Sequence, residues 1–157
     1  SLGTGKNLKI DDVAAETKLP LTHIPDLQEY RFRMYLPDSG WFYHFAYFDN
    51  PKPALRSVRY SFANIDDISA VKMLDMTPVC GLDLGYYRAA LLKMGFIEGP
   101  PHYDVFEEKR GRLLGYQFSR GATLVSIRPQ REGNSPDIKI SHECVNEISV
   151  TSGDEAP

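Results

Sequence analysis

Residues 41–48, WFYHFAYF, constrain the fold more than any other segment, because six of the eight are aromatic. The two exceptions are His44 and Ala46. Aromatic residues favour β-strands, and a half-buried strand normally alternates apolar with polar side chains. Here both faces of the expected strand are apolar. Either both faces are covered inside the domain, or one of them is kept for a partner.

The neighbouring segments alternate strictly, and each predicts a further strand. In residues 29–36 and 57–62 every second residue is apolar or aromatic, which is typical of a strand with one buried face. The PDSG sequence at 37–40 has the composition of a tight turn between the first two strands. Residues 28–63 are therefore expected to form a three-stranded antiparallel meander whose central strand is 41–48.

Helical segments are expected before each set of strands. Residues 9–19 carry two acidic residues near their start, where anions suit the helix dipole, and residues 64–76 have apolar residues at helical spacing. The clearest helix follows Asp83, a suitable N-cap, and Gly95 occupies the position of a left-handed C-cap. Residues 102–150 then alternate again in several short runs, which predicts further strands.

We predict an α+β fold with antiparallel sheet, built from two successive helix-plus-meander halves with the helices packed on one face. The expected boundaries are a flexible tether at 1–8, one compact domain at 9–150 with halves 9–63 and 64–150, and a loose tail at 151–157. This arrangement resembles the small envelope lipoproteins and the β-lactamase-inhibitor-like folds, in which helices pack on an antiparallel sheet. The resemblance concerns architecture alone and implies no residue role.

The sequence argues against nucleic-acid binding and against a membrane-spanning helix. The chain has 157 residues with a formal net charge of −3 and no basic block, so it lacks the electrostatic signature of nucleic-acid binding. No apolar run approaches the roughly 18 residues of a membrane-spanning helix. Because the first residue is Ser1, we expect that an upstream segment was removed, which is a signal segment, a lipid anchor or a cloning leader.

The two cysteines, Cys80 and Cys144, are candidates for one disulfide. In an oxidising compartment the bridge would stabilise the fold by about 4 kcal/mol through loop closure. In a reducing compartment the two residues would be small buried apolar groups. The polar tether and the paired cysteines favour a periplasmic or secreted protein, with a cytoplasmic location left open.

Cys80 also raises a catalytic alternative. It precedes a helix, and His142 follows on a later strand, which is the order found in papain-like cell-wall peptidases and amidases. A helix N-terminus lowers the pKa of a thiol, but Asp83 is the expected cap, so Cys80 lies outside the first turn. The Asp83 carboxylate also disfavours a nearby thiolate. A cysteine-dependent hydrolase using Cys80 and His142 therefore remains an alternative.

Metal and phosphate chemistry find little support. His142 and Cys144 would point the same way along a strand, but no paired spacing such as CxxC or HxxxH accompanies them. GTGK at 3–6 lacks the preceding strand and the spacing of a P-loop. Acidic pairs occur where helix starts and a solvated hairpin are expected, so they do not indicate a catalytic pair of carboxylates. We predict no metal site and no cofactor.

The aromatic strand is then the strongest functional signal, because Trp, Tyr and Arg are enriched at the energetic centres of protein interfaces. We predict a partner-binding surface made of these residues: Trp41, Tyr43, Phe45, Tyr47, Arg31, Arg33 and Arg59. In this interpretation the Phe42 side of the strand serves the core. The competing interpretation is that the second half of the chain covers the Trp41 side and makes it ordinary core.

The main prediction is a non-catalytic, extracytoplasmic protein-binding module, such as an envelope lipoprotein component or an inhibitor or immunity-type protein. Its partner would be a protein and not a nucleic acid. A small-ligand carrier with an aromatic-lined pocket is a further alternative.

Overall fold

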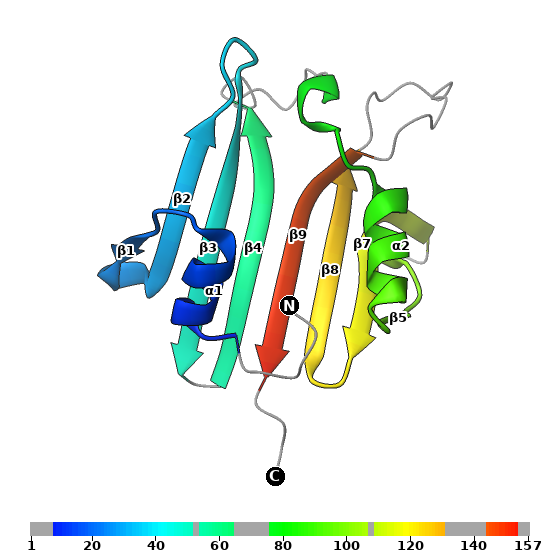
Figure 1. Ribbon diagram of the computed structural model, residues 1–157. Helices are drawn as coiled ribbons and strands as arrows, with labels where there is room; N and C mark the ends of the chain where they lie inside the picture. The colour runs from blue at the N-terminus through cyan, green and yellow to red at the C-terminus, as the bar shows by residue number, and fades with distance from the viewer. Residues whose placement is uncertain (1–7, 52–53, 65–75, 107–108, 131–143, 154–157) are drawn as a thin grey trace.

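The computed structural model describes residues 8–51, 54–64, 76–106, 109–130 and 144–153 (Figure 1). Its helices are α1 (Ile10–Thr17) and α2 (Leu84–Lys93), with short 3-10 helices η1 (Pro25–Leu27) and η2 (Thr77–Val79). Its strands are β1 (Thr22–Ile24), β2 (Glu29–Tyr35), β3 (Trp41–Pro51), β4 (Ala54–Asn64), β5 (Ile97–Glu98), β6 (His102–Phe106), β7 (Lys109–Arg120), β8 (Thr123–Gln130) and β9 (Cys144–Gly153). The predicted α+β class and antiparallel sheet are confirmed.

All the described strands belong to one antiparallel sheet. Its order is β1-β2-β3-β4-β9-β8-β7-β5, and β6 pairs with β7 outside this path. The predicted meander of β2, β3 and β4 is confirmed, with β3 as its central strand. Because β4 also pairs with β9, this meander and the strands β7, β8 and β9 form one continuous sheet (Figure 1).

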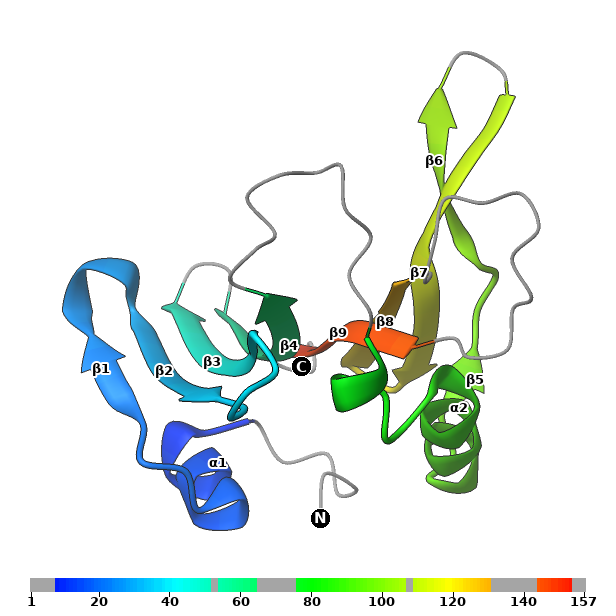
Figure 2. The same ribbon diagram turned by 90° about the horizontal axis from the view of Figure 1, so that it is seen from above.

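The strand register separates two faces of this sheet. We call the face that carries Trp41, Tyr43, Phe45 and Tyr47 the inner face, and the face that carries Phe42, His44, Ala46 and Phe48 the outer face. Figure 2 shows α1 and α2 beside the sheet on one side, while the β6–β7 hairpin extends away on the other side. The buried apolar side chains that contact these helices come from the inner face.

The inner face is divided among three core clusters. The first joins α2 to β7, β8 and β9 and contains Leu84, Leu91, Phe96, Phe118, Val125, Ile127 and Val145. The second joins α1 to β3 and contains Leu8, Val13, Phe45 and Tyr47. The third contains Trp41, Met76, Val79 and Cys144. Burial of these apolar side chains is the main source of stabilisation in such a domain.

The caps predicted for α2 are present. The carboxylate of Asp83 accepts a hydrogen bond from the backbone N–H of Tyr86 at 2.9 Å, which satisfies one of the unpaired donors of the first turn. Gly95 follows the helix with a φ of +82°, a conformation that glycine adopts without steric cost. These local signals therefore set both ends of the helix.

The predicted disulfide is also present. Cys80 and Cys144 are bonded and lie 64 residues apart in the sequence. The bridge fastens the segment after η2 to the first residue of β9, beside the cluster that contains Trp41. Within the described part of the chain, no helix is long and apolar enough to cross a membrane.

Several boundaries differ from the prediction. The short strands β1 and β5 lie in segments for which no strand was predicted, and Leu8, expected in the tether, is buried in the second cluster. β9 continues to Gly153, three residues into the expected tail. Asn64 is the last residue of β4. The helix expected over 64–76 lies almost entirely outside the described residues.

Candidate binding surface

The residues predicted to bind a partner do not form one surface. Trp41, Phe45 and Tyr47 are core residues, with only 3%, 6% and 0% of their surface exposed. Tyr43 is partly buried beside Phe32 and Tyr60. These values argue against a binding surface made of the Trp41 set, because three of its four aromatic side chains are almost completely buried.

The three predicted arginines lie on the opposite side of the sheet. Arg31 pairs with Ala46 across β2 and β3, and Arg33 pairs with His44, so both side chains share the outer face. Arg59 pairs with Ala46 from β4 and joins them there. Since side chains alternate along a strand, these arginines and the Trp41 set are on opposite faces.

Two rows of outer-face residues run across the sheet, as the pairing of successive strands shows. One row reads Arg33, His44, Ser61, Glu147 and Arg128 from β2 to β8. The next row reads Arg31, Ala46, Arg59, Ser149 and Ser126. The charged side chains thus fall into two groups, one on β2 and one on β4, β9 and β8.

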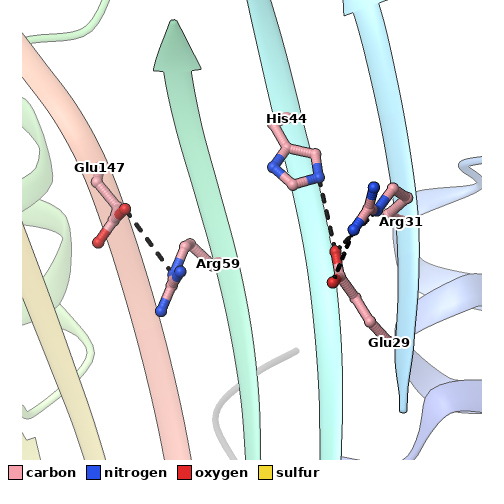
Figure 3. Close-up of polar contacts among 5 residues, drawn as sticks. All are labelled: Glu29, Arg31, His44, Arg59 and Glu147. Carbon is pink, nitrogen blue, oxygen red and sulfur yellow. Dashed lines mark hydrogen bonds and ion pairs between the residues drawn. The ribbon is translucent and has the colours of Figure 1, made fainter. Parts of the chain in front are cut away.

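Glu29 holds the first charged group of the outer face together (Figure 3). Its two carboxylate oxygens accept hydrogen bonds from Nε and Nη2 of Arg31, both at 3.0 Å. This bidentate pairing favours the charged guanidinium and raises the pKa of Arg31. The Glu29 side chain is only 5% exposed, so its charge requires such a partner.

His44 contacts the same carboxylate from β3. Its Nε2 lies 3.7 Å from Oε1 of Glu29, which is too far for a hydrogen bond, and this buried atom has no hydrogen-bond partner among the described residues. Burial lowers the pKa of His44, and the positive charge of Arg33 lowers it further, against the opposing effect of Glu29. His44 is therefore neutral at neutral pH.

Glu147 holds the second charged group. Its Oε2 lies 3.8 Å from Nε of Arg59 and 3.1 Å from Nη2 of Arg128 (Figure 3 shows the first contact). Two guanidinium groups on β4 and β8 therefore share a single carboxylate on β9. One positive charge of this group is left without a matching negative charge on the described outer face.

Aromatic rings on the outer face lie beneath two of the arginines. The guanidinium carbon of Arg33 is 4.8 Å from the centre of the Phe42 ring, and that of Arg59 is 5.5 Å from the centre of the Phe48 ring. Tyr35 continues this surface, with its ring 5.2 Å from Phe42. Such cation–π contacts hold a guanidinium against the sheet while leaving its donors available.

The catalytic and metal alternatives have few residues to act with. Sγ of Cys80 is bonded to Cys144, so no thiolate nucleophile exists in this form, and His142 lies outside the described residues. In the ranges that the structure describes, no group of three or more His, Cys, Asp or Glu side chains could hold a metal ion. The outer face is thus the site with the most distinctive chemistry.

Comparisons with protein-family models, with curated proteins and with solved structures find no match to this chain. The functional argument therefore depends on the chemistry of the outer face alone.

The residues predicted to bind a partner did not include Glu29, Glu147 or Arg128. A signal for Glu29 was available, because it alternates with Arg31 and Arg33 and must point the same way. No such signal joins Arg128 and Glu147 to the first strands, because they come from another part of the chain and reach the outer face only through the β4–β9 pairing.

Proposed function

We propose that this protein is a non-catalytic, extracytoplasmic protein-binding module, comparable in role to an envelope lipoprotein component or an inhibitor or immunity-type protein. We propose further that it binds its partner through the outer face of the sheet. The observation that carries the proposal is the set of arginine and aromatic side chains on this face, with Arg33 over Phe42 and Arg59 over Phe48.

The residue types support a protein interface. Aromatic side chains provide large contact areas with few rotatable bonds, and Arg adds a planar charged group with several hydrogen-bond donors. Tyr, Trp and Arg are enriched among the residues that dominate the binding energy of known interfaces. Tyr35 leaves 59% of its surface exposed at the edge of the outer face, and Arg33 and Arg59 are also exposed. Trp41 does not contact the partner in this proposal, because its side chain belongs to the core on the inner face.

The disulfide supports the proposed compartment. Structural disulfides persist in the periplasm, at the cell surface and in secreted proteins, whereas cytosolic thiols are kept reduced. The buried position of Cys144 suits a structural bridge, since a buried disulfide is poorly accessible to reductants.

Site-specific photo-crosslinking tests the binding surface with a matched pair of positions. A benzophenone amino acid replaces Tyr35 on the outer face, or Tyr86 on α2, and these two tyrosines are 59% and 55% exposed. Both variants are expressed in the native envelope and irradiated. We expect discrete adducts with another protein from the Tyr35 position and none from the Tyr86 position.

Two outcomes would overturn the proposal. If the Tyr35 position gives no adduct, or if the two positions give the same adducts, the outer face is not a selective interface. Lys93, exposed on α2, offers a second control position for crosslinking that reports random collisions.

We also propose that the chain consists of two similar halves. The sheet order supports this, because β2, β3 and β4 form one set and β7, β8 and β9 form a second set that meets it at the β4–β9 pair. Each set follows one of the two described helices along the chain.

A further inference from the structure

The outer face carries more positive than negative charge, although the whole chain is acidic. Four arginines and two glutamates lie on it among the described residues, a net of two positive charges: Arg31, Arg33, Arg59 and Arg128 against Glu29 and Glu147. The chain as a whole has a formal charge of −3. The described part of the outer face, which the proposed function assigns to binding, therefore has a net charge opposite in sign to that of the whole chain.

The unmatched charges have definite positions. Arg31 is neutralised by Glu29, while Arg33, in the next outer-face position of β2, forms no ion pair with any residue that the structure describes. On the other side, Arg59 and Arg128 share Glu147. One uncompensated charge thus lies on β2, and a second lies around β4 and β8.

We propose that the partner of this face is a protein surface that presents acidic side chains to Arg33 and to the Arg59–Arg128 pair. This inference rests on the proposed function and specifies the chemistry of the partner. β2 and β4 are two strand spacings apart, or about 10 Å, so two separate carboxylates are needed to reach both positions. Arginine suits them, because its planar donors match a carboxylate in bidentate geometry.

The two glutamates argue for a protein partner and against a nucleic acid. Glu147 lies between Arg59 and Arg128, and Glu29 lies beside Arg31, so a polyphosphate chain crossing the face would pass close to both carboxylates. A continuous polyanion is favoured by an uninterrupted basic stripe, which this face does not provide among its described residues. A protein can place isolated carboxylates at the positive positions and neutral groups opposite the glutamates.

The rings beneath the arginines strengthen the same choice. Arg33 and Arg59 lie over Phe42 and Phe48, which provide apolar area next to each charge. An interface that combines charge with apolar area is typical of protein partners.

A defined acidic peptide tests the inference. Fluorescein-labelled octaglutamate is titrated with the native, disulfide-bonded protein at low ionic strength, and binding is followed by fluorescence anisotropy. Arg33→Glu combined with Arg59→Glu should weaken binding about tenfold or more, because two attractive charges become repulsive. Lys93→Glu makes a charge reversal on the exposed surface of α2 and should weaken binding less than about twofold, since it leaves the outer face intact.

A second double variant keeps the test valid if Arg33→Glu with Arg59→Glu folds poorly because of the added charge beside Glu147. Arg33→Gln combined with Arg59→Gln removes the charges without introducing repulsion and should weaken binding about threefold or more. Oligothymidylate of equal charge is the competing probe. Tighter binding of the oligothymidylate than of the octaglutamate, or equal loss of octaglutamate binding in the Lys93→Glu variant, would overturn the inference.

The two proposals can fail separately. If the Tyr35 crosslink forms in the envelope but is unaffected by Arg33→Glu with Arg59→Glu, the face binds a partner that is not acidic, and only this inference is lost. If the Tyr35 crosslink never forms, the proposed function itself is lost. If the charge reversals abolish the crosslink while the variant keeps its melting temperature, both proposals are supported.

Discussion

The two faces of β3 use the same kinds of residue for different purposes. On the inner face, Trp41, Phe45 and Tyr47 are buried in two of the core clusters. On the outer face, Phe42 and Phe48 are partly exposed and lie beneath arginines. Aromatic residues on both faces of one strand therefore do not imply two cores. The aromatic rings of the inner face are surrounded by apolar side chains, whereas those of the outer face lie next to guanidinium groups.

The largest expected difference between the faces is in side-chain truncation. Trp41→Ala removes a buried ring from the cluster next to the disulfide and should lower the free energy of unfolding by about 3–5 kcal/mol. Phe42→Ala, at the neighbouring position of the same strand, loses a partly exposed cross-strand contact and should cost about 1 kcal/mol. Urea unfolding of the disulfide-bonded variants measures both values. Equal losses would show that both faces are equally buried.

A smaller difference is expected between a buried and a partly buried position of the inner face when single hydroxyl groups are removed. The Tyr47 hydroxyl donates to the backbone carbonyl of Leu8 at 2.8 Å, and burial raises the pKa of Tyr47 to about 12, so it stays protonated. Tyr47→Phe leaves that carbonyl without its partner and should cost about 1–2 kcal/mol. Tyr43→Phe loses only an exposed 3.5 Å contact with the sulfur of Met34 and should cost less than about 0.5 kcal/mol. A cost of Tyr43→Phe that matched Tyr47→Phe would contradict this ranking.

The smallest expected effect is the pH dependence of stability that arises from His44 on the outer face. Because the folded-state pKa of His44 is lowered, the unfolded chain binds more protons as the pH falls through about 6.5, and the free energy of unfolding decreases on acidification. The wild-type protein should therefore lose more stability than His44→Gln between about pH 7.5 and 5.5. Thermal or urea unfolding at several pH values gives the comparison. Parallel curves would mean that His44 titrates normally in the folded protein.

Local signals in the sequence predicted the elements that are stabilised locally. The alternation in 29–36 and the PDSG turn predicted β2 and its hairpin with β3, and Asp83 and Gly95 predicted the ends of α2. Each of these signals acts within a few residues. The disulfide was predicted as a candidate because only two cysteines are present, so only one pairing exists.

The assignment of the two faces was not accessible in the same way. The alternation of β3 separates Trp41 from Phe42, but it does not specify which side the helices cover. That depends on contacts between distant segments, such as Trp41 with Met76 and Cys144. β1 and β5 were missed because strands of three and two residues carry almost no periodic signal and exist through pairing with β2 and β7. The charged groups of the outer face depend on the same distant pairing.

The order in which the strands appear along the chain has a consequence for folding. β9 comes last among the described strands, yet it lies at the centre of the sheet, between β4 and β8. Until β9 is inserted, β4 and β8 each expose an unpaired edge, and neither set of strands has its full complement of hydrogen bonds. Its first residue, Cys144, is also the one that closes the bridge to Cys80, so oxidation and completion of the sheet occur in the same region. The pairing of β9 with β4 joins strands that lie far apart in the sequence, and pairings of this kind slow folding in general because a long loop must close first.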